Sequence, residues 1–162
     1  MTALTLNNLQ ERYRQRGSID TLEAYLREAV RSGEFEQTIF GGGSVEGDLQ
    51  CDHAFGDGVY CRGLWIPQGT CVIGRIHKQA RVVIVASGRC VFADEFHTRD
   101  VEGPWMGEFR PHSKTAVYAH TDSYWVACLG TELKDSRDAF HLLTSGTHAE
   151  HQAFLQKQEK LK

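Results

Sequence analysis

The sequence has few prolines and no long apolar run. It holds 3 Pro and 16 Gly in 162 residues, with 41% hydrophobic and 24% charged side chains. This balance is typical of one folded globular domain and excludes a disordered or collagen-like chain. Charged side chains interrupt residues 1–30, and no later apolar run is long enough to cross a bilayer. We therefore expect neither a signal peptide nor a membrane span.

A strong net charge is also missing. The 18 Lys and Arg side chains and the 21 Asp and Glu side chains give a formal charge of −3. This excludes a protein whose whole surface binds a polyanion, because such surfaces are strongly basic. We therefore expect no extended nucleic-acid partner and no membrane partner. A small cationic pocket remains compatible with this charge.

The cysteines form no disulfide pattern. Their number is odd and no C-x-x-C pair occurs, which favours free thiols in a reducing compartment. We expect a cytoplasmic protein whose thiols are free and mostly buried. The five cysteines are Cys51, Cys61, Cys71, Cys90 and Cys128.

Short runs rich in β-branched and aromatic residues fill the middle of the chain. Turn signals such as Pro67-Gln68-Gly69 and Ser87-Gly88 separate them. The connections are too short for crossover helices, so the fold class is mainly β, an antiparallel sandwich or barrel such as a jelly roll. The predicted strands are 59–66, 70–77, 81–86, 90–92, 96–101, 105–109, 115–119 and 124–129.

Helical patterns flank these strands. Leu22, Leu26 and Val30 recur at helical spacing between Asp20, a candidate N-cap, and Gly33, and they predict a helix over 21–32. Thr147 as N-cap, with Glu150 in the capping-box position, predicts a second helix over 147–160.

This pattern divides the chain into three parts. Residues 1–44 form a helical segment, with a weaker helix over 4–13 and a Gly-rich linker over 41–44. Residues 45–133 form the β domain, and residues 134–162 form a C-terminal helical extension.

The stretch from Gly69 to His77, with Gly88 beyond it, resembles the first motif of the cupin superfamily. That motif reads G-x5-H-x-H-x3(or 4)-E-x6-G, and its spacing is kept here. Arg75 stands at the first His position and Arg81 at the Glu position, so only His77 is retained. Residues 50–135 resemble small bacteriophage-encoded cupin-like proteins, through the runs 58–62, 118–125 and 130–132. The resemblance implies a double-stranded β-helix, a homo-oligomer and, if the protein is phage-encoded, a host-cytoplasm location.

The two arginines change what the pocket can hold. A guanidinium carries a permanent positive charge and no acceptor, so Arg75 and Arg81 would repel a divalent metal. We expect no cofactor. The alternative is a metal held by His77, His112 and His120, since His112 and His120 lie in a loose version of the second cupin motif.

Arginine forks are preferred partners of carboxylate and phosphate groups. The emptied metal site therefore predicts a site for a small anion, such as a nucleotide or a sugar phosphate. Its candidate residues are Arg75, His77, Lys78, Arg81, Tyr118 and His120. In the competing interpretation the arginines lie on the outer face and His77 is a hydrogen-bonded core residue.

Three classes of function follow. The first is a non-catalytic binding protein for a small anion, such as a phage protein that captures a host defence signal. The second is a metal-dependent cupin enzyme of the isomerase, epimerase or dioxygenase type. The third is a structural homo-oligomer that binds a host protein through its helices. The sequence predicts no catalytic residues.

Overall fold

Two five-stranded sheets pack face to face in the computed structural model, which describes residues 19–33, 38–40 and 49–161. The first sheet has the order β1 (Thr38–Ile39), β4 (Cys71–Ile73), β10 (Ala116–Ala119), β7 (Arg89–Ala93) and β8 (Thr98–Glu102). The second has the order β2 (Cys51–Gly56), β3 (Val59–Ile66), β11 (Ser123–Gly130), β6 (Arg81–Ser87) and β9 (Trp105–Phe109). A small third sheet pairs β5 (Ile76–His77) with β12 (Thr144–Ser145).

The architecture is the expected jelly roll. Every pair in the two large sheets is antiparallel except β1 with β4. Two strands coincide with the sequence prediction, β3 and β9. The stretch 70–77 differs, because the chain leaves the first sheet after Ile73 and pairs again as β5. Strand β2 was not predicted from the sequence.

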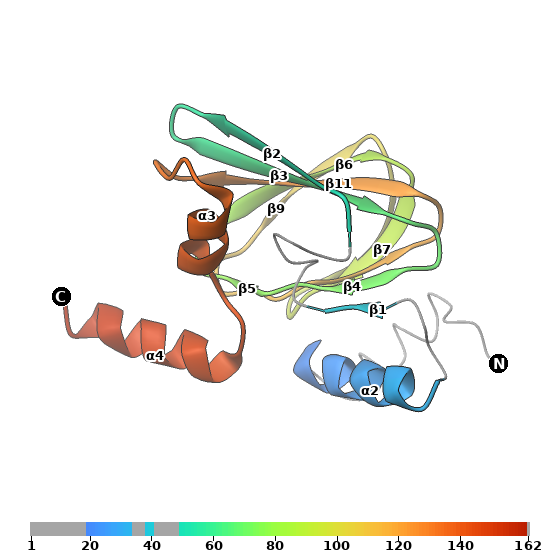
Figure 1. Cartoon of the computed structure of the whole chain (residues 1–162), viewed down its shortest axis with the longest axis horizontal. Helices are drawn as coiled ribbons and strands as arrows, with labels where there is room; N and C mark the ends of the chain where they lie inside the picture. Colours follow the sequence, from blue (N-terminus) through green and yellow to red (C-terminus); the bar gives the residue numbers. More distant parts are fainter. Residues whose placement is uncertain (1–18, 34–37, 41–48, 162) are drawn as a thin grey trace.

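In the described part of the chain, three helices flank the sheets (Figure 1). Helix α2 (Ile19–Arg31) lies against the first sheet, α3 (Ser136–Leu143) lies at one end of the sandwich, and α4 (His148–Glu159) follows β12. None of the described helices has the length and apolar content that a membrane crossing requires.

The ends of α2 and α4 can be compared with the caps that the sequence predicts. Asp20 lies inside α2, which begins at Ile19, so its assignment as N-cap is wrong. The helix ends at Arg31, and Gly33 follows it with a φ of 77° that suits glycine, as expected. Thr147 is confirmed as the N-cap of α4, since its hydroxyl accepts a hydrogen bond from the Glu150 amide. The segments 4–13 and 41–44 lie outside the described residues.

The main core lies between the sheets. Side chains alternate along each strand, so one face of every strand contributes to it. Val83 and Val85 are fully buried there, and Trp125 meets Phe92 and Phe109 edge-on at centroid distances of 5.7 and 5.8 Å.

A second cluster joins α2 to the outer face of the first sheet. Ile19 and Leu26 of the helix pack with Cys71, Ile73 and Val91 of the sheet. An ion pair joins Glu23 of α2 to the buried Lys114, which lies in the connection that leads into β10.

All five cysteines are free thiols in the structure. Cys71 and Cys90 are buried, whereas Cys51, Cys61 and Cys128 are half-buried. The expectation of mostly buried thiols is therefore wrong for three positions, because those three lie toward the edge and the outer face of the second sheet.

Candidate functional site

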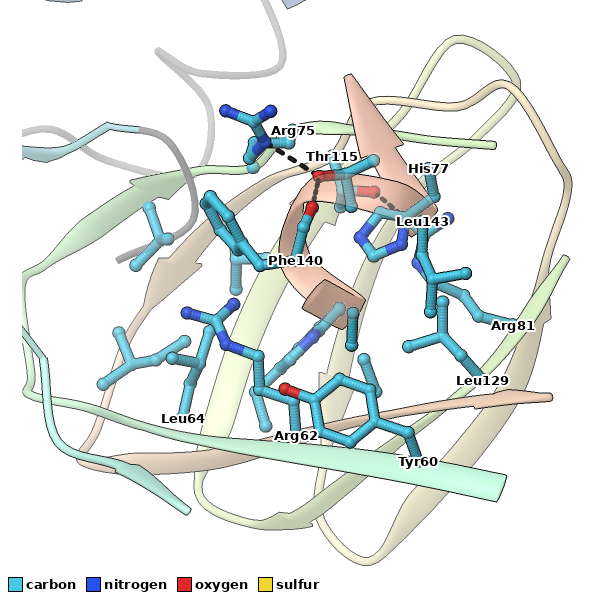
Figure 2. A pocket seen from close by; sticks show the side chains of 18 residues that line it. Tyr60, Arg62, Leu64, Arg75, His77, Arg81, Thr115, Leu129, Phe140 and Leu143 are labelled. Carbon is cyan, nitrogen blue, oxygen red and sulfur yellow. Dashed lines mark hydrogen bonds between the residues drawn. The ribbon is translucent and has the colours of Figure 1, made fainter. Parts of the chain in front are cut away.

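A cavity lies between the two sheets, with about 80 Å³ of space for water-sized molecules. Helix α3 covers one end of it through Ala139, Phe140 and Leu143 (Figure 2). Its walls have two kinds of surface, one cationic and one apolar. The apolar part comprises Leu64, Ile66, Val72, Val117, Trp125, Ala127 and Leu129.

Arg81 is the most deeply buried cation in the wall, with 4% of its surface exposed. Its Nη1 donates to Ser113 Oγ at 3.1 Å and its Nη2 donates to Thr115 Oγ1 at 2.7 Å. Burial lowers the pKa of Arg81 to about 10, while the charges of Asp94 and Glu95 act in the opposite direction. Because that value is still far above neutral, the guanidinium remains charged at physiological pH.

Two more guanidinium groups reach the cavity from different elements. Arg75 precedes β5, and its Nε donates to Thr144 Oγ1 at 2.8 Å. Arg62 lies on the inner face of β3, and Figure 2 shows its head group pointing into the space between the sheets. Both contact the ring of Phe140, with centroid distances of 4.6 Å for Arg75 and 5.9 Å for Arg62. The Phe140 ring of α3 therefore lies against two cations.

His77 completes the cationic part. Its Nδ1 is fully buried and has no hydrogen-bond partner among the described residues. Burial, followed by the charges of Arg81, Arg62 and Arg75, holds the pKa of His77 well below its usual value. The imidazole is therefore neutral at physiological pH and offers one ring nitrogen to a ligand.

The wall of the cavity carries no carboxylate among the described residues. Its lining includes three Arg and one His but no Asp or Glu. None of the described carboxylates lies within ion-pair distance of Arg75 or Arg81, although Asp94 and Glu95 act on Arg81 and Glu150 acts on Arg75 over a longer range. Burial of a cation such as Arg81 without a direct ion pair is costly, so this site is suited to receive a negative charge.

Three of the six predicted site residues meet in this cavity. Arg75, His77 and Arg81 all line the cavity, with Arg81 next to His77, and none of the three lies on the outer face of the sheets (Figure 2). The Nδ1 of His77 lacks a hydrogen-bond partner in the described structure, so no backbone carbonyl satisfies that atom.

The other three predicted residues lie elsewhere. Inward-facing Val117 and Ala119 place Tyr118 on the outer face of β10, where it packs against the α2 cluster. His120 contacts Tyr118 edge-on at 5.2 Å and does not line the cavity. Lys78 donates to the carbonyl of Leu142 at 3.0 Å, at the junction of α3 and α4. The prediction that these three residues share the pocket with Arg75 is therefore wrong. Tyr118 faces away from the cavity on its strand, His120 lies beside it, and Lys78 lies against α3.

Tyr60, Arg62 and Phe140 were not predicted from the sequence. Arg62 could have been found, because it lies two residues from both Tyr60 and Leu64 in strand 59–66 and therefore shares their face. Phe140 belongs to α3, whose N-cap Asp135 accepts from the Arg137 and Asp138 amides. That N-cap, with Ala139, Phe140 and Leu143 at helical spacing, is a readable signal for a short helix.

The metal that cupin folds often carry does not fit these residues. Among the described residues no group of three or more His, Cys, Asp or Glu side chains could hold a metal ion. His112 Nδ1 lies 3.0 Å from His151 Nε2, outside the cavity, and His120 lies beside Tyr118. The alternative metal set of His77, His112 and His120 is therefore not brought together.

Comparisons with known proteins assign no family to this chain. No family model and no curated protein matches the sequence. An RmlC-like cupin from Shewanella frigidimarina NCIMB 400 shares 13% identity, with 54% of this chain and 80% of that chain covered and a TM-score of 0.46. KdgF from Halomonas sp. shares 14% identity, with 64% and 92% covered and a TM-score of 0.48. DMSP lyase DddQ from Ruegeria pomeroyi DSS-3 shares 13%, with 57% and 51% covered and a TM-score of 0.48. At these similarities the strand order itself carries the fold assignment.

The neutral state of His77 predicts a pH effect on stability. Its folded pKa is lowered, so below about pH 6.5 the unfolded chain binds a proton that the folded chain does not. Stability therefore falls as the pH drops. Between about pH 7.5 and about pH 5.5, we expect the free energy of unfolding to fall by about 1 kcal/mol less in His77→Gln than in the parent protein. Urea unfolding at each pH measures this difference.

His53 and His151 also have lowered pKa values, so the comparison is between variant and parent at each pH. His141→Gln, at an exposed position of α3, is the matched control and should leave the pH profile unchanged. A His77→Gln profile identical to that of the parent would contradict the assignment of a neutral, buried His77.

Proposed function

We propose that this protein binds a small organic anion in the cavity between its sheets and does not turn it over. One observation carries the proposal: three guanidinium groups and an unpartnered imidazole nitrogen line a cavity whose described walls hold no carboxylate. A carboxylate or phosphate placed there would accept charge-assisted hydrogen bonds and would compensate the buried charge of Arg81.

The rest of the wall favours a ligand that also has an apolar part. Leu64 and Val72 contribute hydrocarbon side chains to it, and Trp125 contributes an aromatic ring. A compact anion with an apolar body would fill both parts, because burying apolar surface contributes about 25 cal/mol per Å². The small volume supports a compact ligand over a large one. A nucleotide or a sugar phosphate is the anion that the two arginines at the metal positions of the motif predict, and a host defence signal is the form it would take if the protein is phage-encoded.

Isothermal titration calorimetry tests the proposal with a panel of anions. The panel contains branched and aromatic monocarboxylates, sugar phosphates, and mono-, di- and cyclic nucleotides. We expect at least one member to bind, and Arg75→Gln to weaken its binding by about 10-fold, since a charge-assisted hydrogen bond contributes about 1.5–3 kcal/mol.

The control is Arg99→Gln, which removes the same charge from an exposed position of β8. It should leave the affinity unchanged. Failure of every anion in the panel to bind, or equal weakening by both variants, would refute an anion site in the cavity.

A further inference from the structure

Two cysteines face each other across neighbouring strands of the second sheet. Cys61 of β3 and Cys128 of β11 are direct partners in the antiparallel register. Their sulfur atoms lie 3.2 Å apart, with the Cys61 thiol donating to the Cys128 sulfur. Both residues are half-buried free thiols on the outer face of the sheet, away from the cavity.

This pairing suits a covalent bond between the two sulfurs. Directly opposed residues of an antiparallel pair have Cα atoms about 4.5 or 5.5 Å apart, which is within the range of about 4.4–6.8 Å seen in disulfides. The thiols are already in contact, so the bond requires only a small rotation of two side chains.

The remaining cysteines have no such arrangement. Cys71 and Cys90 are fully buried, and burial raises the pKa of each thiol to about 12. Cys51 pairs with Leu64 in the register and therefore lies on the inner face of the same sheet. Of the five thiols, Cys61 and Cys128 are thus the pair that can react both with each other and with a molecule from solvent.

We propose that Cys61 and Cys128 form a dithiol site that reacts with small-molecule disulfides and closes to a reversible cross-strand disulfide. Cys61 loses its proton to solvent, and its thiolate attacks one sulfur of the incoming disulfide. The sulfur–sulfur bond of that molecule breaks and one thiolate leaves. Cys128 then loses its proton and attacks the Cys61 sulfur, so the Cys61–Cys128 bond forms and the second thiolate leaves. The two protein thiols are oxidised by two electrons, and the small disulfide is reduced to two thiols.

The order of the two attacks follows from the surroundings of Cys128. Burial and the hydrogen bond from Cys61 raise the pKa of Cys128 to about 11. A thiol reacts through its thiolate, so Cys128 is a poor first nucleophile. It becomes effective in the second step, because the mixed disulfide on Cys61 lies next to it.

The bond would join two strands that also build the cavity. Tyr60 and Arg62 flank Cys61, Ala127 and Leu129 flank Cys128, and all four line the cavity from the inner face. Oxidation on the outer face therefore fixes the spacing of two strands whose inner side chains form one wall of the site.

Mass spectrometry of the full chain treated with oxidised glutathione tests this site. We expect the parent protein to lose two hydrogen atoms and to yield a peptide pair linked through Cys61 and Cys128, with both changes reversed by a reducing agent. Cys128→Ser should instead accumulate one glutathione adduct on Cys61. Cys61→Ser should react at least about 10-fold more slowly than Cys128→Ser.

Cys51→Ser is the matched control, since it removes a half-buried thiol from the other face and should leave the linked pair unchanged. Disulfides between two chains, an adduct on Cys51 in place of the linked pair, or unmodified Cys61 and Cys128 after treatment of the folded parent would each overturn the proposal. Circular dichroism of every variant confirms that the thiols are compared in the same fold.

Discussion

Arg81→Met is expected to reduce anion binding by about 30-fold or more while leaving the ligand-free protein as stable as the parent to within about 1 kcal/mol. The guanidinium is buried and forms hydrogen bonds with two hydroxyl groups, without an ion pair to any described carboxylate. Removing one partner from a buried, hydrogen-bonded charge pair costs about 2 kcal/mol or more of binding energy. Methionine keeps most of the side-chain volume against Phe109, and it avoids the desolvation of a charge.

Calorimetry measures the affinity and urea unfolding measures the stability of the same preparation. Arg99→Met, on the exposed side of β8, should change neither quantity. The two readouts separate two explanations. Unchanged affinity would remove Arg81 from the binding site, whereas a large loss of stability would show that its hydrogen bonds to Ser113 and Thr115 hold the fold together.

Trp125→Ala is expected to lower the free energy of unfolding by about 3–5 kcal/mol. Trp125 is 6% exposed, contacts Phe92 and Phe109 edge-on, and also forms part of the cavity floor. The substitution removes these contacts and adds empty space beside an existing cavity, which limits how far the neighbours can fill it. Denaturant unfolding followed by circular dichroism measures the loss.

A second tryptophan provides the control. Trp65 is 42% exposed on the outer face of β3, where it stacks on Tyr124 at 4.2 Å and donates to Asp52 at 3.0 Å. We expect Trp65→Ala to cost about 1 kcal/mol, because 42% of its surface stays exposed and its removal leaves no enclosed cavity. Equal losses of unfolding free energy in the two variants would contradict the placement of Trp125 on the inner face of β11.

The strands could be predicted because they depend on local pattern. Short runs of β-branched and aromatic residues between turn signals are enough to define β3 and β9 with their ends. The alternation of side chains along a strand shows why Tyr118 was misplaced. Its side chain was assigned to the pocket from its chemistry, but the face of a strand is decided by its neighbours, and Val117 and Ala119 are the residues that enter the core.

Half of the site could not be predicted because it depends on long-range packing. Arg75 and Arg81 came from their positions in the cupin-like motif, whereas Arg62 and Phe140 reach the cavity only once β3 and α3 are placed together. The domain boundaries, the homo-oligomer and a host partner remain predictions. An oligomer or a partner depends on the surface of a second chain, which this sequence does not contain.

Helix α3 also determines how fast the site can exchange its contents. Phe140 and Leu143 form one end of the cavity, and the ring of Phe140 lies against both Arg75 and Arg62. A molecule entering or leaving at this end must displace that ring, and the ring can move only if eight residues of helix shift with it or the side chain rotates out. The rate of entry at this end would then depend on the opening of α3, and the rate of dissociation would depend both on that opening and on how strongly the arginines hold the anion.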